Sequence, residues 1–364
     1  IIALTFIFDG LIEFGLSFNR ALEKMEREAL VKIIVNLVIV SLGITSLIFM
    51  PSAKSLAIAY AIGSGVGLLI TITILRHYLK NLFSNFNKDL LWPILSSAWP
   101  FAIMGFSGAI MVNIDTVMIG WFRSASEVGY YSAAQRPIQL LYVIPNLLGS
   151  AIFPVMARFA TKDNDKFRQI LEKSITIVLA VGIPIAIGGA ILGKDMITVL
   201  FGSGYAPAAT TFVILLFTLL LVLPNTLISG SLFAYNEQKN FLGFIIINAL
   251  INISLNYLLI PSYGMPGAAI ATLIANFSAS IFIWNKMKKI NYFSVISHLK
   301  IIALATLIMA VNASVFQYLH LNFFVNLFLS ATIYVGLLIS FKEPVIKEIL
   351  GIFQLQNKSE NQII

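Results

Sequence analysis

The chain has 364 residues, of which 59% are hydrophobic and only 11% are charged, and its net charge is +8. A soluble domain normally carries about 25% charged residues, so this chain cannot cover a globular surface with polar groups, although it can lie in lipid. The basic residues occur in short segments between apolar runs, which is typical of a membrane protein and argues against a nucleic-acid partner. Cysteine is absent, which excludes disulfides, thiolate nucleophiles and cysteine metal sites.

Eleven predominantly apolar runs approach the length of about 20 residues that a helix needs to cross a bilayer. They are about twice as long as a transmembrane β-strand and do not alternate in polarity, which excludes a β-barrel. The sequence therefore predicts an all-α, polytopic membrane helical bundle. The runs cover residues 1–19, 31–50, 55–75, 93–122, 129–157, 172–193, 208–234, 240–260, 265–285, 299–319 and 322–341.

The charges between these runs predict the topology. If every run is a helix, most of the 24 Lys and Arg residues fall on one side, and only Lys54, Arg123 and Lys194 fall on the other. Basic loops stay cytoplasmic, so the richer side is predicted to face the cytoplasm of the cell (inner) membrane, together with the C-terminus. Residue 1 is Ile within an apolar run, without the charged start of a signal peptide, and we expect the natural N-terminus to lie upstream.

A weak internal repeat suggests how the helices are grouped. Segment 31–62 aligns without gaps with segment 243–274, and the repeat pairs helices that are six apart. Because six is an even number, the paired helices have the same orientation in the membrane, and we predict two parallel six-helix lobes. The first lobe lacks three upstream helices in this sequence, and two further helices follow the second lobe. The predicted divisions are 1–80 for the second half of the first lobe, 90–290 for the C-terminal lobe, 298–342 for the extra helices and 343–364 for a cytoplasmic tail.

The most specific sequence lies in the fourth and fifth runs. They read Asn113-Ile-Asp115-Thr-Val-Met-Ile-Gly120 and Glu127-Val-Gly129-Tyr130-Tyr131-Ser-Ala-Ala-Gln-Arg136. These stretches resemble the seventh and eighth helices of the Wzx-type polysaccharide-biosynthesis flippases, within the multidrug/oligosaccharidyl-lipid/polysaccharide exporter superfamily. The segment from Tyr263 to Ala271 fits the same family, and the similarity runs in order along nearly the whole chain, as helices four to fourteen.

The resemblance implies two bundles around a central cavity that opens alternately to each side, as in the MATE-like flippase fold. It implies an undecaprenyl- or, in archaea, dolichyl-pyrophosphate-linked oligosaccharide as substrate, moved from the cytoplasmic to the outer leaflet for surface glycan synthesis. Membrane lipids and other glycan-assembly proteins are the further partners to expect. Two alternatives stay open: a MATE-type cation-coupled drug antiporter, and a membrane polysaccharide polymerase or ligase, against which the short outer loops argue.

Charges within the predicted helices are the main candidate functional residues, because a charge at the centre of a bilayer is costly. Asp115 and Arg136 lie at similar depths in adjacent antiparallel runs, about 10 Å below the outer end. One interpretation is an internal ion pair. The other is that Arg136 faces the cavity and binds pyrophosphate with its guanidinium fork, while Asp115 holds Arg136 in place or exchanges with the substrate. Asn113 and Gln135 beside them are further candidate substrate ligands.

Two more sets of polar residues lie within runs. Asp9 and Glu13 share one helix face, where two carboxylates either bind H⁺ or Na⁺ during transport or pair with basic residues of upstream helices. Asn248, Asn252 and Asn256 form one stripe, which either makes hydrogen bonds between helices or forms a wall that binds sugar. The sequence contains no metal-ligand spacing and no P-loop, so we predict no metal site, no catalytic residues and no ATP-driven cycle.

Overall fold

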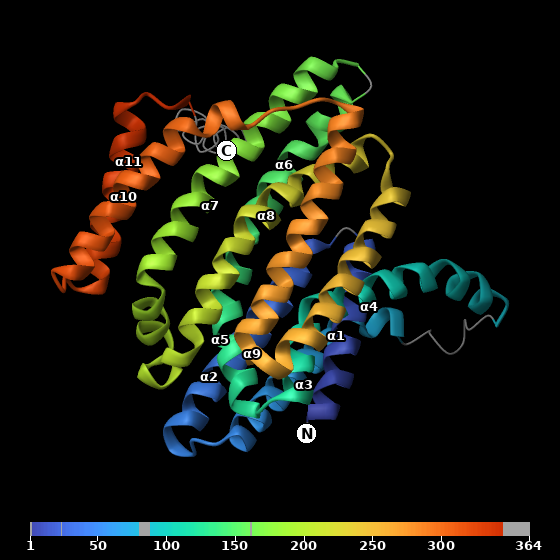
Figure 1. Ribbon diagram of the computed structural model, residues 1–364. Coiled ribbons are helices and arrows are strands. Elements are labelled where there is room, and N and C mark those ends of the chain that lie inside the picture. The colour runs from blue at the N-terminus through green and yellow to red at the C-terminus, as the bar shows by residue number, and fades with distance from the viewer. Residues whose placement is uncertain (1, 23, 80–87, 161, 345–364) are drawn as a thin grey trace, which may run out of the picture. The chain divides into compact units, whose positions relative to one another are not determined.

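The computed structural model describes residues 2–22, 24–79, 88–160 and 162–344. Within these ranges the chain is almost entirely helical and contains no strand, as the sequence predicts. The helices form two compact units, residues 1–103 and 104–364, which we call unit 1 and unit 2 and describe separately. The helix α4 (Leu91–Phe122) contributes residues to both (Figure 1).

Unit 1 is built on three helices that pack on one another, and α4 begins in it after the short 3₁₀ helix η1 (Lys88–Leu90). Glycines lie at the contacts: Gly15 of α1 packs against Thr71 of α3, and Gly67 of α3 packs against Val35 of α2. Small residues let helix backbones approach closely, which is how membrane helices associate without a hydrophobic driving force. The three helices are α1 (Ile2–Ala21), α2 (Met25–Phe49) and α3 (Ala53–Leu79).

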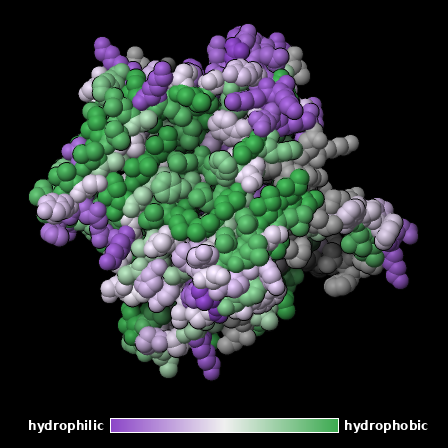
Figure 2. All heavy atoms as spheres, viewed as in Figure 1, coloured by the Kyte–Doolittle hydropathy of each residue, from purple (hydrophilic) through white to green (hydrophobic). Residues whose placement is uncertain are grey.

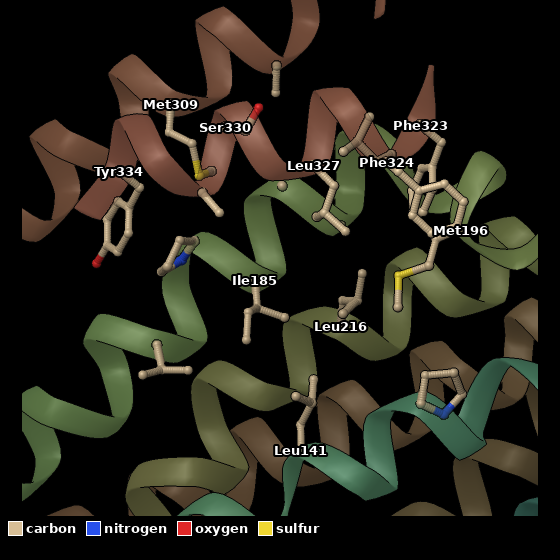
Figure 3. Close-up of a pocket in the computed structure, with 18 of the residues that line it drawn as sticks. Leu141, Ile185, Met196, Leu216, Met309, Phe323, Phe324, Leu327, Ser330 and Tyr334 are labelled. Atoms are coloured by element: carbon tan, nitrogen blue, oxygen red, sulfur yellow. The ribbon is translucent and has the colours of Figure 1, made fainter. Parts of the chain in front are cut away.

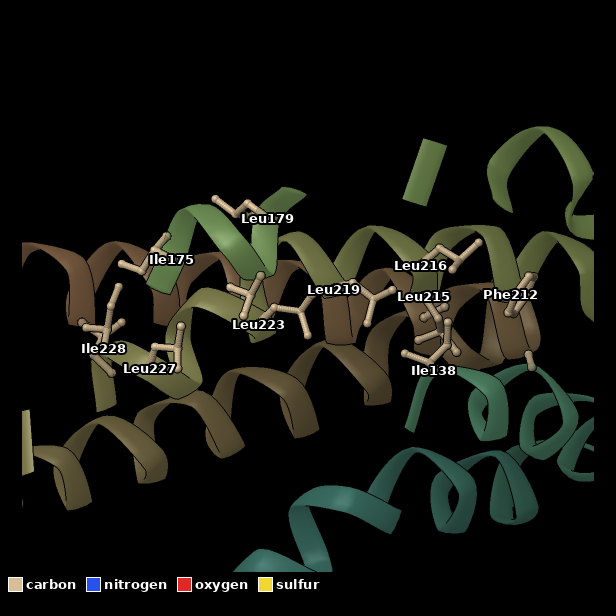
Figure 4. Packing of buried hydrophobic residues seen from close by; sticks show 14 of the residues in the cluster. Ile138, Ile175, Leu179, Phe212, Leu215, Leu216, Leu219, Leu223, Leu227 and Ile228 are labelled. Carbon is tan, nitrogen blue, oxygen red and sulfur yellow. The ribbon is translucent and has the colours of Figure 1, made fainter. Parts of the chain in front are cut away.

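Unit 2 packs around α8, which contacts α5, α6, α7 and α9. Along α8, Leu216, Leu219, Leu223 and Leu227 recur every three or four residues and are at most 2% exposed, so one helix stripe supplies much of the core (Figure 4). The pair α10 and α11 packs mainly on α7. The elements are α5 (Ala125–Leu141), α6 (Val143–Phe159), α7 (Asn164–Phe201), η2 (Ser203–Ala208), α8 (Ala209–Ala234), α9 (Gln238–Ile290), η3 (Ile296–Leu299), α10 (Lys300–Tyr318) and α11 (Phe323–Ser340).

The division of the chain into helices differs from the predicted runs at one place and agrees with them at another. The run 129–157 is two helices, α5 and α6, which meet at Tyr142, just before Pro145 in the first turn of α6, where a proline is tolerated. The runs 240–260 and 265–285 are confirmed as two helical segments: they are the two halves of α9, which turns back at Gly264 between them (Figure 1). Gly264 has φ 60° and ψ −141°, a conformation open to a residue without Cβ.

The described residues contain eight helical segments that are long and apolar enough to cross a membrane. They lie in α2, α3, α5–α6, α7, α8, α9, α10 and α11 and include nine of the eleven predicted runs, whereas membrane crossing by α1 and α4 stays a prediction. Figure 2 shows a broad hydrophobic surface over α7, α10 and α11, with hydrophilic residues toward the helix ends. The chain is therefore a multi-pass membrane protein. The sidedness, the lobe divisions and the tail, of which 345–364 lies outside the described residues, stay predictions.

Candidate functional site

A buried carboxylate lies where α4, α5 and α9 meet in unit 2. Asp115 of α4 is 4% exposed, and its Oδ2 accepts hydrogen bonds from Tyr131 Oη and Thr272 Oγ1, both at 2.6 Å. Its Oδ1 accepts a hydrogen bond from Asn256 Nδ2, also at 2.6 Å. Together with Asn252, these residues form what we call the Asp115 cluster. All three donors are neutral, so the carboxylate is satisfied by hydrogen bonds rather than by a cation.

The turn in α9 assembles this cluster. Asn252 and Asn256 precede Gly264 and Thr272 follows it, so the two halves of α9 lie side by side here. Asn252 Nδ2 donates to Thr272 Oγ1 at 3.2 Å, and Asn256 Nδ2 also donates to Asn252 Oδ1 at 3.0 Å. Asn256 Oδ1 is buried and has no hydrogen-bond partner within the described part of the chain. The cluster therefore leaves one buried side-chain oxygen, that of Asn256, without a donor among the described residues.

The ion pair between Asp115 and Arg136 that the sequence allows is not formed. Tyr131 and Arg136 are five residues apart on α5, which separates their directions by about 140° around the helix axis. Tyr131 faces Asp115, so Arg136 points away from it. Arg136 is exposed, and the described residues provide neither an ion pair nor a hydrogen bond to its side chain.

Arg136 instead lies at the edge of an apolar pocket of about 1080 Å³ that we call the α11 pocket. The pocket is lined by α5, α7, α8, α10 and α11, and Figure 3 shows side chains of these helices directed into it. Its two other polar side chains are already bonded: Tyr334 Oη donates to Ala180 O at 2.6 Å, and Ser330 Oγ donates to Asn326 Oδ1 at 3.0 Å. Arg136 is thus the one charged side chain among the described lining residues.

The remaining predicted substrate ligands have different surroundings. Gln135 Nε2 donates to Val112 O at 3.3 Å, which links α5 to α4, and Asn113 is exposed on α4. The side-chain oxygen of Asn248 is buried, and no partner for it lies among the described residues. Because Asn252 and Asn256 bond within the Asp115 cluster, the geometry favours the interhelical interpretation for these two members of the asparagine stripe.

The two acidic residues of α1 in unit 1 are engaged separately. Asp9 Oδ1 accepts a hydrogen bond from Ser64 Oγ of α3 at 2.7 Å. Glu13 is exposed and lies 3.8 Å from Arg20 Nη2, while Arg20 Nε binds Glu28 at 2.8 Å. The described residues therefore include no common partner of the two carboxylates, and the role of Asp9 and Glu13 in ion coupling stays a prediction.

Sequence reasoning missed Tyr131 and Thr272 as partners of Asp115. The available signal was symmetry: Asn256 and Thr272 lie equally far in sequence on either side of Gly264, so a turn there places them together. It also missed a contact at the turn itself, where Glu127 Oε2 of α5 accepts a hydrogen bond from Met265 N at 3.3 Å.

Two family models match the chain. Residues 1–160 match the model described as polysaccharide biosynthesis protein, and residues 100–258 match the MatE model. Together the two matches cover residues 1–258 without a gap.

Several named proteins are similar to parts of the chain. The probable flippase AglR of Haloferax volcanii is 31% identical over 172 residues, which is 46% of this chain and 36% of the relative. The probable low-salt glycan biosynthesis flippase Agl15 of the same organism is 28% identical over 163 residues, 44% of this chain and 34% of the relative. A putative O-antigen transporter of Shigella flexneri is 28% identical over 174 residues, 44% of this chain and 38% of the relative. The matched segments thus span little more than a third of these relatives.

One solved structure shares the fold of most of the chain. A lipid II flippase MurJ in an inward closed conformation superposes with a TM-score of 0.75 and 21% identity, covering 94% of this chain and 73% of the other. This likeness shows the fold.

Proposed function

We propose that this chain, which belongs to the multidrug/oligosaccharidyl-lipid/polysaccharide exporter superfamily, translocates a lipid-linked glycan precursor across a membrane. The proposed substrate is a polyprenyl- or dolichyl-pyrophosphate oligosaccharide, moved from the cytoplasmic to the outer leaflet by alternating access. The similar proteins named as flippases and as an O-antigen transporter support this proposal, although each overlaps the chain in part.

The observation that carries the proposal is Arg136 at the edge of the α11 pocket. A lipid-linked glycan joins a long hydrocarbon to an anionic pyrophosphate. The α11 pocket is as apolar as the bilayer interior. The hydrocarbon of the substrate can therefore stay out of water in this pocket while the head group crosses the membrane. The guanidinium presents several donors in a planar fork, which matches phosphate oxygens. Arg136 has no partner among the described residues that a phosphate would have to displace.

The α11 pocket also weighs against a drug antiporter as the main function. A cationic drug is stabilised by a carboxylate in its binding site, and the described lining residues of the pocket include no acidic side chain. The match to the MatE model is explained by membership of the shared superfamily.

The Asp115 cluster suits a role in coupling translocation to H⁺ or Na⁺. Its carboxylate is buried with neutral partners, and Asn256 Oδ1 beside it lacks a donor in the described structure. A proton or a small hard cation is the species that such a set of oxygens accepts. The cluster joins both halves of α9 to α4 and α5, so occupancy there would bias how these helices pack.

The test is translocation of a fluorescent polyprenyl-pyrophosphate oligosaccharide by the protein in liposomes. Arg136→Ala is expected to lower the initial rate at least tenfold, since a charge-assisted hydrogen bond contributes about 1.5–3 kcal/mol. Arg136→Lys should retain part of the rate, because a lysine keeps the charge but loses the fork. The matched control is Arg158→Ala, because Arg158 is an exposed arginine on α6 that does not line the α11 pocket. An inactive wild type, or an Arg136→Ala variant as fast as wild type, would refute the proposal.

A further inference from the structure

A second pocket lies between α6 and α8 and shares no lining residue with the α11 pocket. It has a volume of about 580 Å³, within the range of about 300–1,000 Å³ found for small-molecule sites. We call it the α6–α8 pocket. Unlike the α11 pocket, it combines side-chain oxygens from both helices with the rings of Phe153 and Phe233.

The polar groups of this pocket share one property: each already donates a hydrogen to a backbone carbonyl three or four residues earlier in the chain. Their four side-chain oxygens therefore remain as acceptors, and the second hydrogen on Asn146 Nδ2 is the only side-chain donor left over among the described lining residues. None of its lining residues is charged. The bonds run from Asn146 Nδ2 to Tyr142 O at 2.7 Å, from Ser150 Oγ to Leu147 O at 2.9 Å, from Thr226 Oγ1 to Val222 O at 2.9 Å and from Ser229 Oγ to Asn225 O at 2.7 Å.

The depth of the pocket argues that a polar species fills it. Asn146 is exposed and lies 13 residues before Phe159, the end of a segment long enough to cross the membrane, which corresponds to about 20 Å along a helix. An exposed amide at that depth is costly against hydrocarbon. The pocket therefore opens to water or to a polar ligand rather than to lipid tails.

We infer that the α6–α8 pocket binds sugar residues of the transported precursor, an inference that rests on the proposed function. A saccharide carries many O–H donors, which the four acceptor oxygens satisfy, and C–H faces, which pack against aromatic rings such as Phe153 and Phe233. A pyrophosphate would find no cation here, and a cationic drug would find no carboxylate. Arg136 thus binds the pyrophosphate of the precursor, while the α6–α8 pocket binds its sugar residues.

Gly230 of α8 provides a substitution that fills the pocket without disturbing the fold. It lines the pocket, and a Cβ added there meets no atom within 4 Å, so Gly230→Leu extends into open space. Leucine also favours a helix over glycine, so the variant should remain folded. The matched control is Gly336→Leu on α11, where an added Cβ likewise meets nothing within 4 Å and which lines neither pocket.

The experiment measures binding of two probes to the purified full chain. One probe is a short-chain polyprenyl pyrophosphate, and the other is the same lipid carrying a sugar, tested with N-acetylglucosamine, galactose and mannose in turn. Wild type should bind a glycosylated probe about tenfold more tightly than the bare lipid, which is about 1.4 kcal/mol. Gly230→Leu should abolish that difference while leaving affinity for the bare lipid unchanged, and Gly336→Leu should preserve the difference.

The outcomes separate this inference from the proposed function. If wild type binds neither probe, the proposed function fails, and the inference fails with it. If wild type binds every glycosylated probe no better than the bare lipid, or if Gly230→Leu keeps the full preference, the sugar is read elsewhere and the inference alone is overturned. Equal loss of both probes in Gly230→Leu would also overturn it, because the pocket would then hold the lipid.

Discussion

The two charged groups that the sequence places at similar depths have opposite surroundings in unit 2. Asp115 is 4% exposed and accepts three hydrogen bonds from Tyr131, Thr272 and Asn256. Arg136 is exposed at an apolar pocket, with no partner in the described part of the chain. One charge is integrated into the helix packing, whereas the other is left free for a ligand.

This difference separates a residue that shapes the protein from one that recognises its substrate. Buried polar groups are normally hydrogen-bonded, and removing an acceptor leaves its donors unsatisfied. An exposed side chain without partners leaves nothing unsatisfied when it is removed. Substitution by alanine should therefore have different effects at the two positions. At Asp115 it should lower the stability of the fold, whereas at Arg136 it should lower transport and leave the stability nearly unchanged.

The largest expected effect on stability is that of Asp115→Ala. It leaves the donors of Tyr131, Thr272 and Asn256 without their acceptor, and we expect a loss of about 3 kcal/mol in the free energy of unfolding. Arg136→Ala should change the same quantity by less than about 0.5 kcal/mol, because surface substitutions usually do. Unfolding of the purified protein in detergent measures both, and equal losses would break the comparison.

Asp115→Asn is the control that separates structure from coupling. It keeps the shape of the side chain but removes the carboxylate. We expect it to unfold more like wild type than Asp115→Ala does, and to translocate the lipid-linked probe at a rate that no longer responds to a gradient of H⁺ or Na⁺. A wild-type response in Asp115→Asn would remove Asp115 from the coupling mechanism.

A smaller loss in the free energy of unfolding is expected for substitutions at the turn of α9. The charged residue there, Glu127, is less buried than Asp115 and, unlike Arg136, has defined partners. Glu127 is partly buried beside Arg123, at 3.6 Å, and accepts from Met265 N at the start of the second half of α9. Gly264→Ala should cost about 2 kcal/mol, since φ is positive and a Cβ would lie 2.5 Å from Glu127 Oε2. Glu127→Ala should cost about 1 kcal/mol, as for the loss of a helix cap.

The double variant divides the cost at Gly264 into its two causes. Glu127→Ala removes the nearest atom that the new Cβ would meet, leaving Arg123 Nη2 at 3.0 Å and the positive φ, so the two substitutions together should cost less than the sum of their separate losses. Additive losses in the free energy of unfolding would mean that the backbone conformation alone explains why glycine occupies this position.

Much of the fold could be predicted because hydrophobic length is a direct physical requirement of the bilayer. Nine of the eleven predicted runs lie in segments long and apolar enough to span it. The division between the runs 240–260 and 265–285 is confirmed by the turn at Gly264, whereas hydropathy did not show the break between α5 and α6 at Tyr142. That break depends on where the backbone bends, and hydropathy does not distinguish a bent helix from two helices.

The sequence singled out Asp115, Arg136, Asn252 and Asn256 as candidate residues, but it did not give their pairing, and it missed Tyr131 and Thr272. Counting residues along each helix gives the depth of a side chain in the membrane, and the similar depths of Asp115 and Arg136 suggested that the two could meet. Which way a side chain points depends on how α5 is rotated, and the burial of Tyr131 fixes that rotation. The role of Thr272 depends on the turn at Gly264, which brings together segments distant along the chain.

The smallest effect is expected for Asp163, a charge at the surface that nevertheless has defined partners. It precedes α7, its Oδ1 accepts from Lys166 N at 3.0 Å, and its Oδ2 lies 3.6 Å from Lys166 Nζ. The backbone hydrogen bond, followed by the lysine charge, holds the pKa of Asp163 below its ordinary value of about 3.9. The ionised form therefore stabilises the folded state above that value, and this contribution is lost as the pH falls through the lower, folded pKa.

Asp163→Asn isolates this contribution, since asparagine caps a helix about as well but does not titrate in this range. The difference in unfolding temperature between wild type and Asp163→Asn should be constant near neutral pH and should vanish once the pH has fallen below the lowered pKa of Asp163 in the folded state. Because the main cause is a hydrogen bond rather than a distant charge, raising the salt concentration should change that difference little. A difference that persisted in acid would mean that Asp163 acts only as a neutral cap, and that exposed charges here contribute nothing through ionisation.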